Sequence, residues 1–231
     1  MYWYEFLINN KELIKILYGL VIGIICLIIV LKTHKLYHFS GHEGIRYFRN
    51  AFLFYGLAFV IRYIFGGIVE IGYIEVNYIS LIRILFEFFL VMGGFFLLYS
   101  LLWKKLETAK DNLSSLISLR SFVFYGMAFI IAVIDFIWQV HYFLFLSQMI
   151  LFLVLSIMSY TNYRRDKGKN VFPKFYFVAM VFSLIAWILN GIAGFYFNWS
   201  RAVLIEVYVL NIIVFLLFLY GVIKITKKPK L

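Results

Sequence analysis

Charged and amide side chains lie inside the long apolar stretches of this sequence, where such groups are rarely placed without a partner or a role. An ionisable side chain at the centre of a membrane span costs ~2.5–3.5 kcal/mol on insertion scales, so these groups usually face the interior of a helix bundle. By residue count, nearly all of them fall in the half of their helix nearest one side of the membrane. The set comprises Arg62, Arg83, Glu87, Asp135, Gln148, Asn190 and Glu206.

Helical spacing indicates how these groups align. Arg62, Gly66 and Glu70 recur at every fourth position, which places them on one stripe of a helix. Arg83 and Glu87 stand four residues apart on the next helix. The pattern predicts a polar cavity that opens to the outside, with Arg62 deepest, at the floor, and carboxylates in the walls.

The same charges also permit a purely structural interpretation. Both arginines would then form ion pairs that fix the register of the helices and do nothing else. The acids available for such pairs are Glu87, Asp135 and Glu206.

Three histidines suggest a metal site near the start of the second apolar stretch. His34, His38 and His42 recur at every fourth position, a spacing at which one helix face presents several metal ligands. However, Ser40 and Glu43 match a capping box that starts a new helix, and a break there would separate His42 from the other two. We therefore expect an interfacial linker without a metal, with a pH-sensing role as a second alternative.

The apolar stretches predict the fold. A helix that crosses ~30 Å of hydrocarbon needs roughly 20 mostly apolar residues. Seven stretches satisfy this requirement: 13–31, 50–71, 77–102, 121–140, 142–160, 172–197 and 201–225. We expect an all-α, polytopic membrane protein with one domain over residues 1–231, made of a lead helix and three helical hairpins at 50–102, 121–160 and 172–225. The recurrence of FYGLAF as FYGMAF at 124–129 supports related hairpins.

Small residues predict where the helices approach one another. Gly19 and Gly23 form a small-xxx-small pair in the first span, and Gly93 and Gly94 leave a gap in the side-chain surface of the third span. In lipid, such residues let helices pack closely in place of a hydrophobic driving force.

The composition and the charge distribution indicate a membrane location. The chain is 65% apolar and 14% charged, with a mean hydropathy of +0.94. Of the 22 Lys and Arg residues, Arg62 and Arg83 lie deep within spans, 17 lie on one side of the predicted membrane, and only Lys11, Lys15 and Arg201 lie on the other. The positive-inside rule then predicts an outside N-terminus and a cytoplasmic C-terminus, in the cell membrane of a prokaryote. The net charge of +11 is explained by anionic headgroups rather than by nucleic acid.

The sequence favours a receptor- or sensor-like bundle that binds a small polar ligand, without a cofactor. In helix count and orientation the chain resembles seven-helix receptor and sensor bundles. A separate cytoplasmic or membrane protein would then carry the output. The first alternative is a small ion- or proton-coupled transporter with Glu87 or Glu206 as the proton carrier. The second is a structural or accessory membrane subunit. An enzyme is disfavoured because the sequence contains no nucleophile motif or metal-ligand motif.

Overall fold

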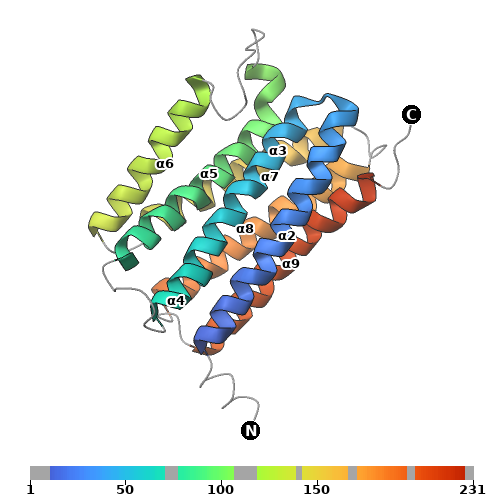
Figure 1. The fold of residues 1–231 in the computed structure, drawn as a ribbon. Helices are drawn as coiled ribbons and strands as arrows, with labels where there is room; N and C mark the ends of the chain where they lie inside the picture. Colours follow the sequence, from blue (N-terminus) through green and yellow to red (C-terminus); the bar gives the residue numbers. More distant parts are fainter. Residues whose placement is uncertain are drawn as a thin grey trace.

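The computed structural model describes residues 11–70, 78–106, 119–138, 142–165, 171–196 and 201–226, and nearly all of them are helical (Figure 1). In chain order the elements are α2 (Lys11–Ser40), α3 (Glu43–Phe59), the π-helix η1 (Val60–Phe65), α4 (Gly66–Glu70), α5 (Tyr78–Leu106), α6 (Leu119–Trp138), α7 (Tyr142–Arg165), α8 (Val171–Phe195) and α9 (Arg201–Thr226). The segments α3, η1 and α4 follow one another without a break and form a single rod.

Seven of the described rods are long and apolar enough to cross a membrane, so the predicted all-α fold with seven such helices is confirmed. They are Leu13–Ser40, Glu43–Val69, Tyr78–Trp103, Ser121–Trp138, Tyr142–Arg165, Pro173–Phe195 and Glu206–Thr226. The first two differ most from the prediction. The first continues to Ser40 rather than ending near residue 31, and the second begins at Glu43 rather than near residue 50.

Six of the rods close into a ring. Along it, α2 packs against the α3 rod, α3 against α5, α5 against α7, α7 against α8, α8 against α9, and α9 against α2. The remaining helix, α6, stands outside this ring and packs mainly along α5 (Figure 1). Of the three predicted hairpins, α3–α5 and α8–α9 pack closely, whereas α6 and α7 touch only sparingly.

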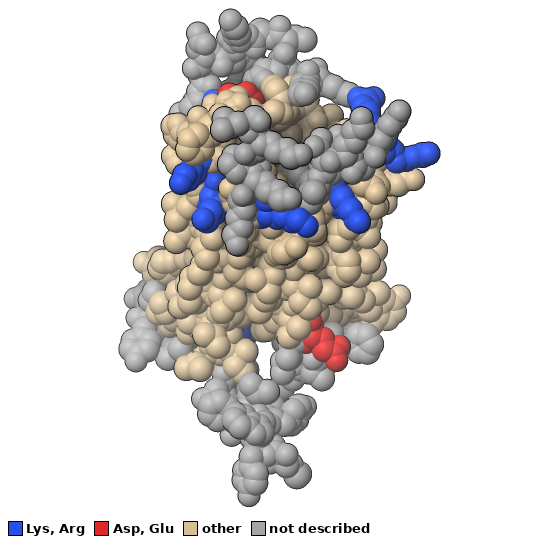
Figure 2. Space-filling view, turned by 90° about the vertical axis from the view of Figure 1, so that its right-hand side faces the viewer, with Lys and Arg blue, Asp and Glu red and all other residues tan. Residues whose placement is uncertain are grey.

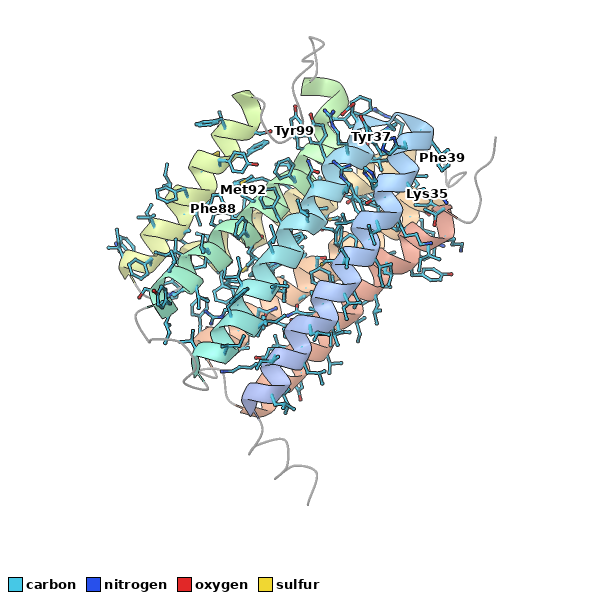
Figure 3. All side chains as sticks on the ribbon, viewed as in Figure 1. Lys35, Tyr37, Phe39, Phe88, Met92 and Tyr99 are labelled. Carbon is cyan, nitrogen blue, oxygen red and sulfur yellow. The ribbon has the colours of Figure 1, made fainter. Side chains whose placement is uncertain are left out.

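Aromatic side chains of α5 hold α6 in place. Figure 3 shows Phe88, Met92 and Tyr99 in a row along α5, beside α6. Phe88 stacks on Tyr125 of α6 with the ring centroids 6.2 Å apart, and Tyr99 meets Phe124 edge-on at 5.8 Å. These contacts place the second copy of the repeated hexapeptide outside the ring, whereas the first copy lies within it on α3.

Basic residues gather at one end of the bundle. Figure 2 shows Lys and Arg side chains in a band toward the end that carries the turn between α2 and α3 and the last residues of α9. We call it the basic end, and the other the opposite end. Because successive rods alternate in direction, α2 starts at the opposite end and α9 finishes at the basic end (Figure 1).

The turn between α2 and α3 breaks the helix where the sequence predicts a break, but not by a capping box. Ser40 is the last residue of α2, and its hydroxyl donates to the Leu36 carbonyl oxygen at 2.9 Å. Gly41 takes the left-handed conformation, with φ +60°, and its N–H donates to the Tyr37 carbonyl oxygen at 2.8 Å. This is a glycine C-cap, which satisfies the end of α2. The capping-box prediction is wrong because His42, not Ser40, precedes the first turn of α3.

Gly19 sets the distance between α2 and the α3 rod, as predicted for the small residues of the first span. A Cβ atom at Gly19 would lie 2.5 Å from the Tyr63 Cβ and 3.3 Å from the Phe59 carbonyl oxygen. Both atoms are fixed by the backbone of the α3 rod and cannot move aside as the end of a flexible side chain can. The Gly19→Ala change should therefore push the rods apart. We expect a loss of about 1–3 kcal/mol in the free energy of unfolding.

Equilibrium unfolding in detergent micelles measures this loss, and Gly126→Ala on α6 is the matched control. A Cβ at Gly126 meets nothing within 4 Å, so that variant should unfold like the parent protein or slightly later, since alanine is the better helix former. Equal stabilities for the two alanine variants would show that the α2 contact is not close-packed.

Candidate functional site

An internal cavity of about 160 Å³ lies within the ring of helices. Side chains from the α3 rod, α5, α7, α8 and α9 contribute to its lining. Most of its wall is aromatic, unlike the polar cavity expected from the sequence, and includes Phe59, Phe86, Phe145, Phe152, Trp187 and Phe215. The arrangement suits an apolar, ring-containing molecule, because cavities of this kind take their affinity from apolar contact and their specificity from a few polar groups.

Polar groups line the cavity toward the opposite end of the bundle. Arg62, Asn190 and Asn211 come from η1, α8 and α9 respectively. Arg62 and Asn190 both lie in the last third of rods that run away from the basic end. The Asn190 side-chain nitrogen donates to the Ala186 carbonyl oxygen at 2.7 Å, which directs its amide along the cavity wall.

Arg62 stands on the π-helical segment of the α3 rod. Such segments widen one helical turn and occur frequently at functional sites. The guanidinium carbon of Arg62 lies 5.3 Å from the centroid of the Phe86 ring, which is a cation–π contact. Arg62 is also exposed at the protein surface, so it forms the open end of the cavity rather than the predicted floor.

Arg62 has no acidic partner among the side chains that the structure describes. The described ion pairs join other residues, and the predicted stripe partner Glu70 has a side chain outside the described set. The cation therefore rests on an aromatic face within the cavity lining. A guanidinium in this setting binds carboxylate or phosphate groups well.

Arg83 and Glu87 form a structural ion pair. The Arg83 Nε lies 3.3 Å from the Glu87 Oε1, and the Glu87 side chain is fully buried. Neither residue lines the cavity. For these two residues the ion-pair interpretation agrees with the geometry, as their spacing of four positions on one helix indicates.

Asp135 joins two helices. Its Oδ1 accepts hydrogen bonds from the backbone N–H groups of Phe143 at 3.1 Å and Leu144 at 3.3 Å, in the first turn of α7. First-turn N–H groups have no acceptor within their own helix, so the Asp135 carboxylate caps α7 from the end of α6. Asp135 is 1% exposed and lies outside the cavity lining.

Gln148 and Glu206 occupy contrasting positions. Gln148 is fully buried on α7, and neither atom of its amide group has a hydrogen-bond partner among the described residues. It packs against α5, where a Cβ at Gly94 would lie 3.2 Å from the Gln148 Oε1. Glu206 is exposed on α9 and does not line the cavity.

Sequence reasoning missed several polar residues of the cavity, among them Asn211 and Tyr55. Asn211 lies in the apolar stretch of α9, and the rule that selected Asn190 would also have selected it. Tyr55 is 5% exposed and lines the cavity, and its hydroxyl has no hydrogen-bond partner among the described residues. The signal for Tyr55 was its place in the repeated hexapeptide, but the repeat alone does not show which copy faces inward.

The three candidate histidines are not gathered around a common point. The Arg49 Nη1 donates to the His34 Nδ1 at 2.9 Å, and the His38 ring meets the His34 ring edge-on. His42 instead packs against Trp103 of α5, with the ring centroids 4.7 Å apart. Within the described part of the chain, no three His, Cys, Asp or Glu side chains are placed to hold a metal ion.

Length and composition of the seven rods define the class: this is a multi-pass membrane protein. The chain is similar to an uncharacterized protein of Archaeoglobus fulgidus, with 28% identity over 221 residues that cover 90% of each chain. No protein-family model matches the chain, and no solved structure matches it. The likeness covers most of both chains, so it extends well beyond a single hairpin.

Proposed function

We propose that the protein is a receptor- or sensor-like membrane bundle that binds a small amphipathic anion in the cavity. The aromatic wall would hold the apolar body of the ligand, and Arg62 would bind its anionic group, with Asn190 and Asn211 as further polar contacts. This ligand differs from the purely polar one that the sequence predicts, because the lining is mostly aromatic.

The observation that carries the proposal is the position of Arg62. A guanidinium that lines an aromatic cavity, lies over the Phe86 ring and has no described acidic partner is suited to a ligand anion. Arginines that serve structure alone in a membrane bundle are expected to pair with acids, as Arg83 does with Glu87.

A matched pair of probes tests this proposal: 3-phenylpropanoate and its neutral analogue 3-phenylpropanol. We expect the acid to bind the full-length protein in detergent micelles more tightly than the alcohol, as measured by calorimetric titration. Arg62→Gln should weaken binding of the acid about 10- to 100-fold and leave the alcohol unchanged, since a hydrogen bond to a charged group contributes about 1.5–3 kcal/mol. Arg49→Gln is the control, because Arg49 bonds His34 and Asn50 away from the cavity. Unchanged affinity for the acid in Arg62→Gln would contradict the proposal.

Transport is the second candidate function, and the π-helical segment favours it. Transporters often bind substrates where a membrane helix is interrupted, and η1 interrupts the α-helical pattern of the α3 rod beside the cavity. Uptake of 3-phenylpropanoate into sealed proteoliposomes would favour transport, and binding without uptake would favour the receptor. Glu87 is engaged by Arg83 and Glu206 lies off the cavity, so neither supports a proton-carrier role directly. If the protein binds neither probe, a structural or accessory role is the remaining candidate function.

We further propose that the basic end faces the cytoplasm of the cell, in contact with anionic headgroups. Clustered Lys and Arg residues at one end support this orientation, since such residues are retained on the cytoplasmic side. A cytoplasmic or membrane protein that receives the signal would meet the bundle at the same end.

A further inference from the structure

We infer that the ligand of the cavity is an aromatic carboxylate that carries a hydroxyl group at the end away from the carboxylate, and that Tyr55 binds this hydroxyl. The inference rests on the proposed function, because it takes Arg62 as the carboxylate-binding group. It adds the functional group at the end of the ligand that lies away from the carboxylate.

Tyr55 presents a buried hydroxyl that bonds no atom of the described residues. The residue is 5% exposed and lines the cavity, and no described atom accepts or donates a hydrogen bond at its oxygen. Buried polar groups in native proteins are almost always satisfied by protein, ordered water or ligand. The ring is also held in place, since a Cβ at Gly93 of α5 would lie 2.9 Å from it. A fixed, unsatisfied hydroxyl in a cavity wall is therefore a binding group for a polar atom of the occupant.

Gln148 is a second buried polar side chain near the same stretch of α5. Tyr55 packs against Gly93 and Gln148 packs against Gly94. Two buried side chains whose polar atoms bond nothing in the described part of the chain therefore meet adjacent positions of α5. Gln148 also lies four residues from Leu144, a cavity-lining residue of the same α7 face.

The polar groups of the cavity lie at two depths. Tyr55 and Arg62 are seven residues apart on the α3 rod, and Ser183 and Asn190 are seven residues apart on α8. Seven helical residues rise roughly 10 Å. Both rods run from the basic end, so Tyr55 and Ser183 form the inner depth, and Arg62 and Asn190 form the outer depth.

Aromatic rings fill the wall between the two depths. The Phe59 and Phe215 rings lie 5.4 Å apart across the contact between the α3 rod and α9, and Trp187 faces the cavity from α8. The volume of about 160 Å³ is close to the ~150 Å³ of an apolar cavity that binds benzene in another protein. The cavity therefore has room for one aromatic ring, and a ligand with a short carboxylate chain on one side of that ring and a polar group on the other matches the spacing of the two depths.

The inner depth selects a hydroxyl group rather than a carbonyl group. The Ser183 hydroxyl donates its proton to the Ala179 carbonyl oxygen at 2.8 Å, so its oxygen is left as an acceptor. A carbonyl on the ligand would only accept, whereas a hydroxyl both donates to such an acceptor and accepts from Tyr55. A phenol-like hydroxyl meets both requirements.

Three acids test the inference: 3-(4-hydroxyphenyl)propanoate, 3-phenylpropanoate and octanoate. In calorimetric titrations of the full-length protein, the hydroxyl should tighten binding about 10-fold relative to 3-phenylpropanoate, as expected for one added hydrogen bond. Tyr55→Phe should abolish that gain, so that the variant binds the two aromatic acids equally tightly. The control is Tyr125→Phe, which alters the equivalent tyrosine of the repeated hexapeptide on α6, outside the cavity lining.

The remaining outcomes contradict the inference in separate ways. If the parent protein binds the hydroxylated acid no more tightly than 3-phenylpropanoate, or if Tyr55→Phe keeps the tighter binding, Tyr55 does not bind the hydroxyl group. Neither result would contradict the anion site at Arg62. Tighter binding of octanoate than of either aromatic acid would show that the cavity takes an acyl chain, as from a membrane lipid. If none of the three acids binds, the proposed function fails together with the inference. The variant should fold, because Tyr55→Phe keeps the ring and removes only an unsatisfied hydroxyl.

Discussion

Replacing Arg83 with methionine should lower the free energy of unfolding by about 3–5 kcal/mol. The change removes the ion-pair partner of Glu87, whose side chain is fully buried, and breaking a buried pair from one side leaves an uncompensated charge. Methionine retains much of the apolar stem of arginine, so the loss reports the charge rather than a cavity. Equilibrium unfolding in detergent micelles at neutral pH gives the measurement.

The double variant Arg83→Met, Glu87→Leu tests whether the loss of stability comes from breaking the ion pair or from the two substitutions separately. With both charges removed, the protein should recover at least half of the stability that Arg83→Met loses, since replacing a buried pair with apolar residues is often close to neutral. Losses that simply add in the double variant would show that the two residues do not act as a pair.

Replacing Asp135 with alanine should lower the free energy of unfolding by about 2–4 kcal/mol. The change removes the acceptor for the N–H groups of Phe143 and Leu144, and each hydrogen bond to a charged acceptor contributes about 1.5–3 kcal/mol. In a membrane bundle, water does not readily replace the lost acceptor. Thermal and chemical unfolding of the variant in micelles measure the effect.

Two further variants identify the cause of that loss. Asp135→Asn keeps an acceptor oxygen without the charge, so it should lose about half as much stability as Asp135→Ala. Glu206→Ala removes an exposed acid and should stay within about 0.5 kcal/mol of the parent protein. If Asp135→Ala is as stable as Glu206→Ala, the carboxylate is not the cap of α7.

These two effects divide the intramembrane charges by role. Arg83 and Glu87 pair within α5 and Asp135 caps α7, whereas Arg62 lines the cavity without a described acidic partner. A variant of Arg62 should therefore change ligand binding more than it changes stability. The contrast also separates the receptor and transporter proposals from a purely structural one, because only the first two require Arg62 to meet a ligand.

The sequence by itself determined the seven helices and the break between the first two. Hydropathy over roughly 20 residues is a local property, and it was enough to identify every span. The helix break at Gly41 and the pair formed by Arg83 and Glu87 were also predictable, because each depends on residues no more than four positions apart. The contact of Gly19 with the α3 rod followed from small-residue spacing.

Only the tertiary structure decided what each polar group does. Asp135 was grouped with the cavity residues, but its partners are backbone groups of α7, and side-chain patterns do not encode a bond to another helix's backbone. The π-helical turn around Arg62 contains no proline or glycine that would signal it. The cavity is lined from the α3 rod and four further helices, so its aromatic character and the inward position of Tyr55 depend on helix rotations that are set by packing, not by the order of residues in any one span.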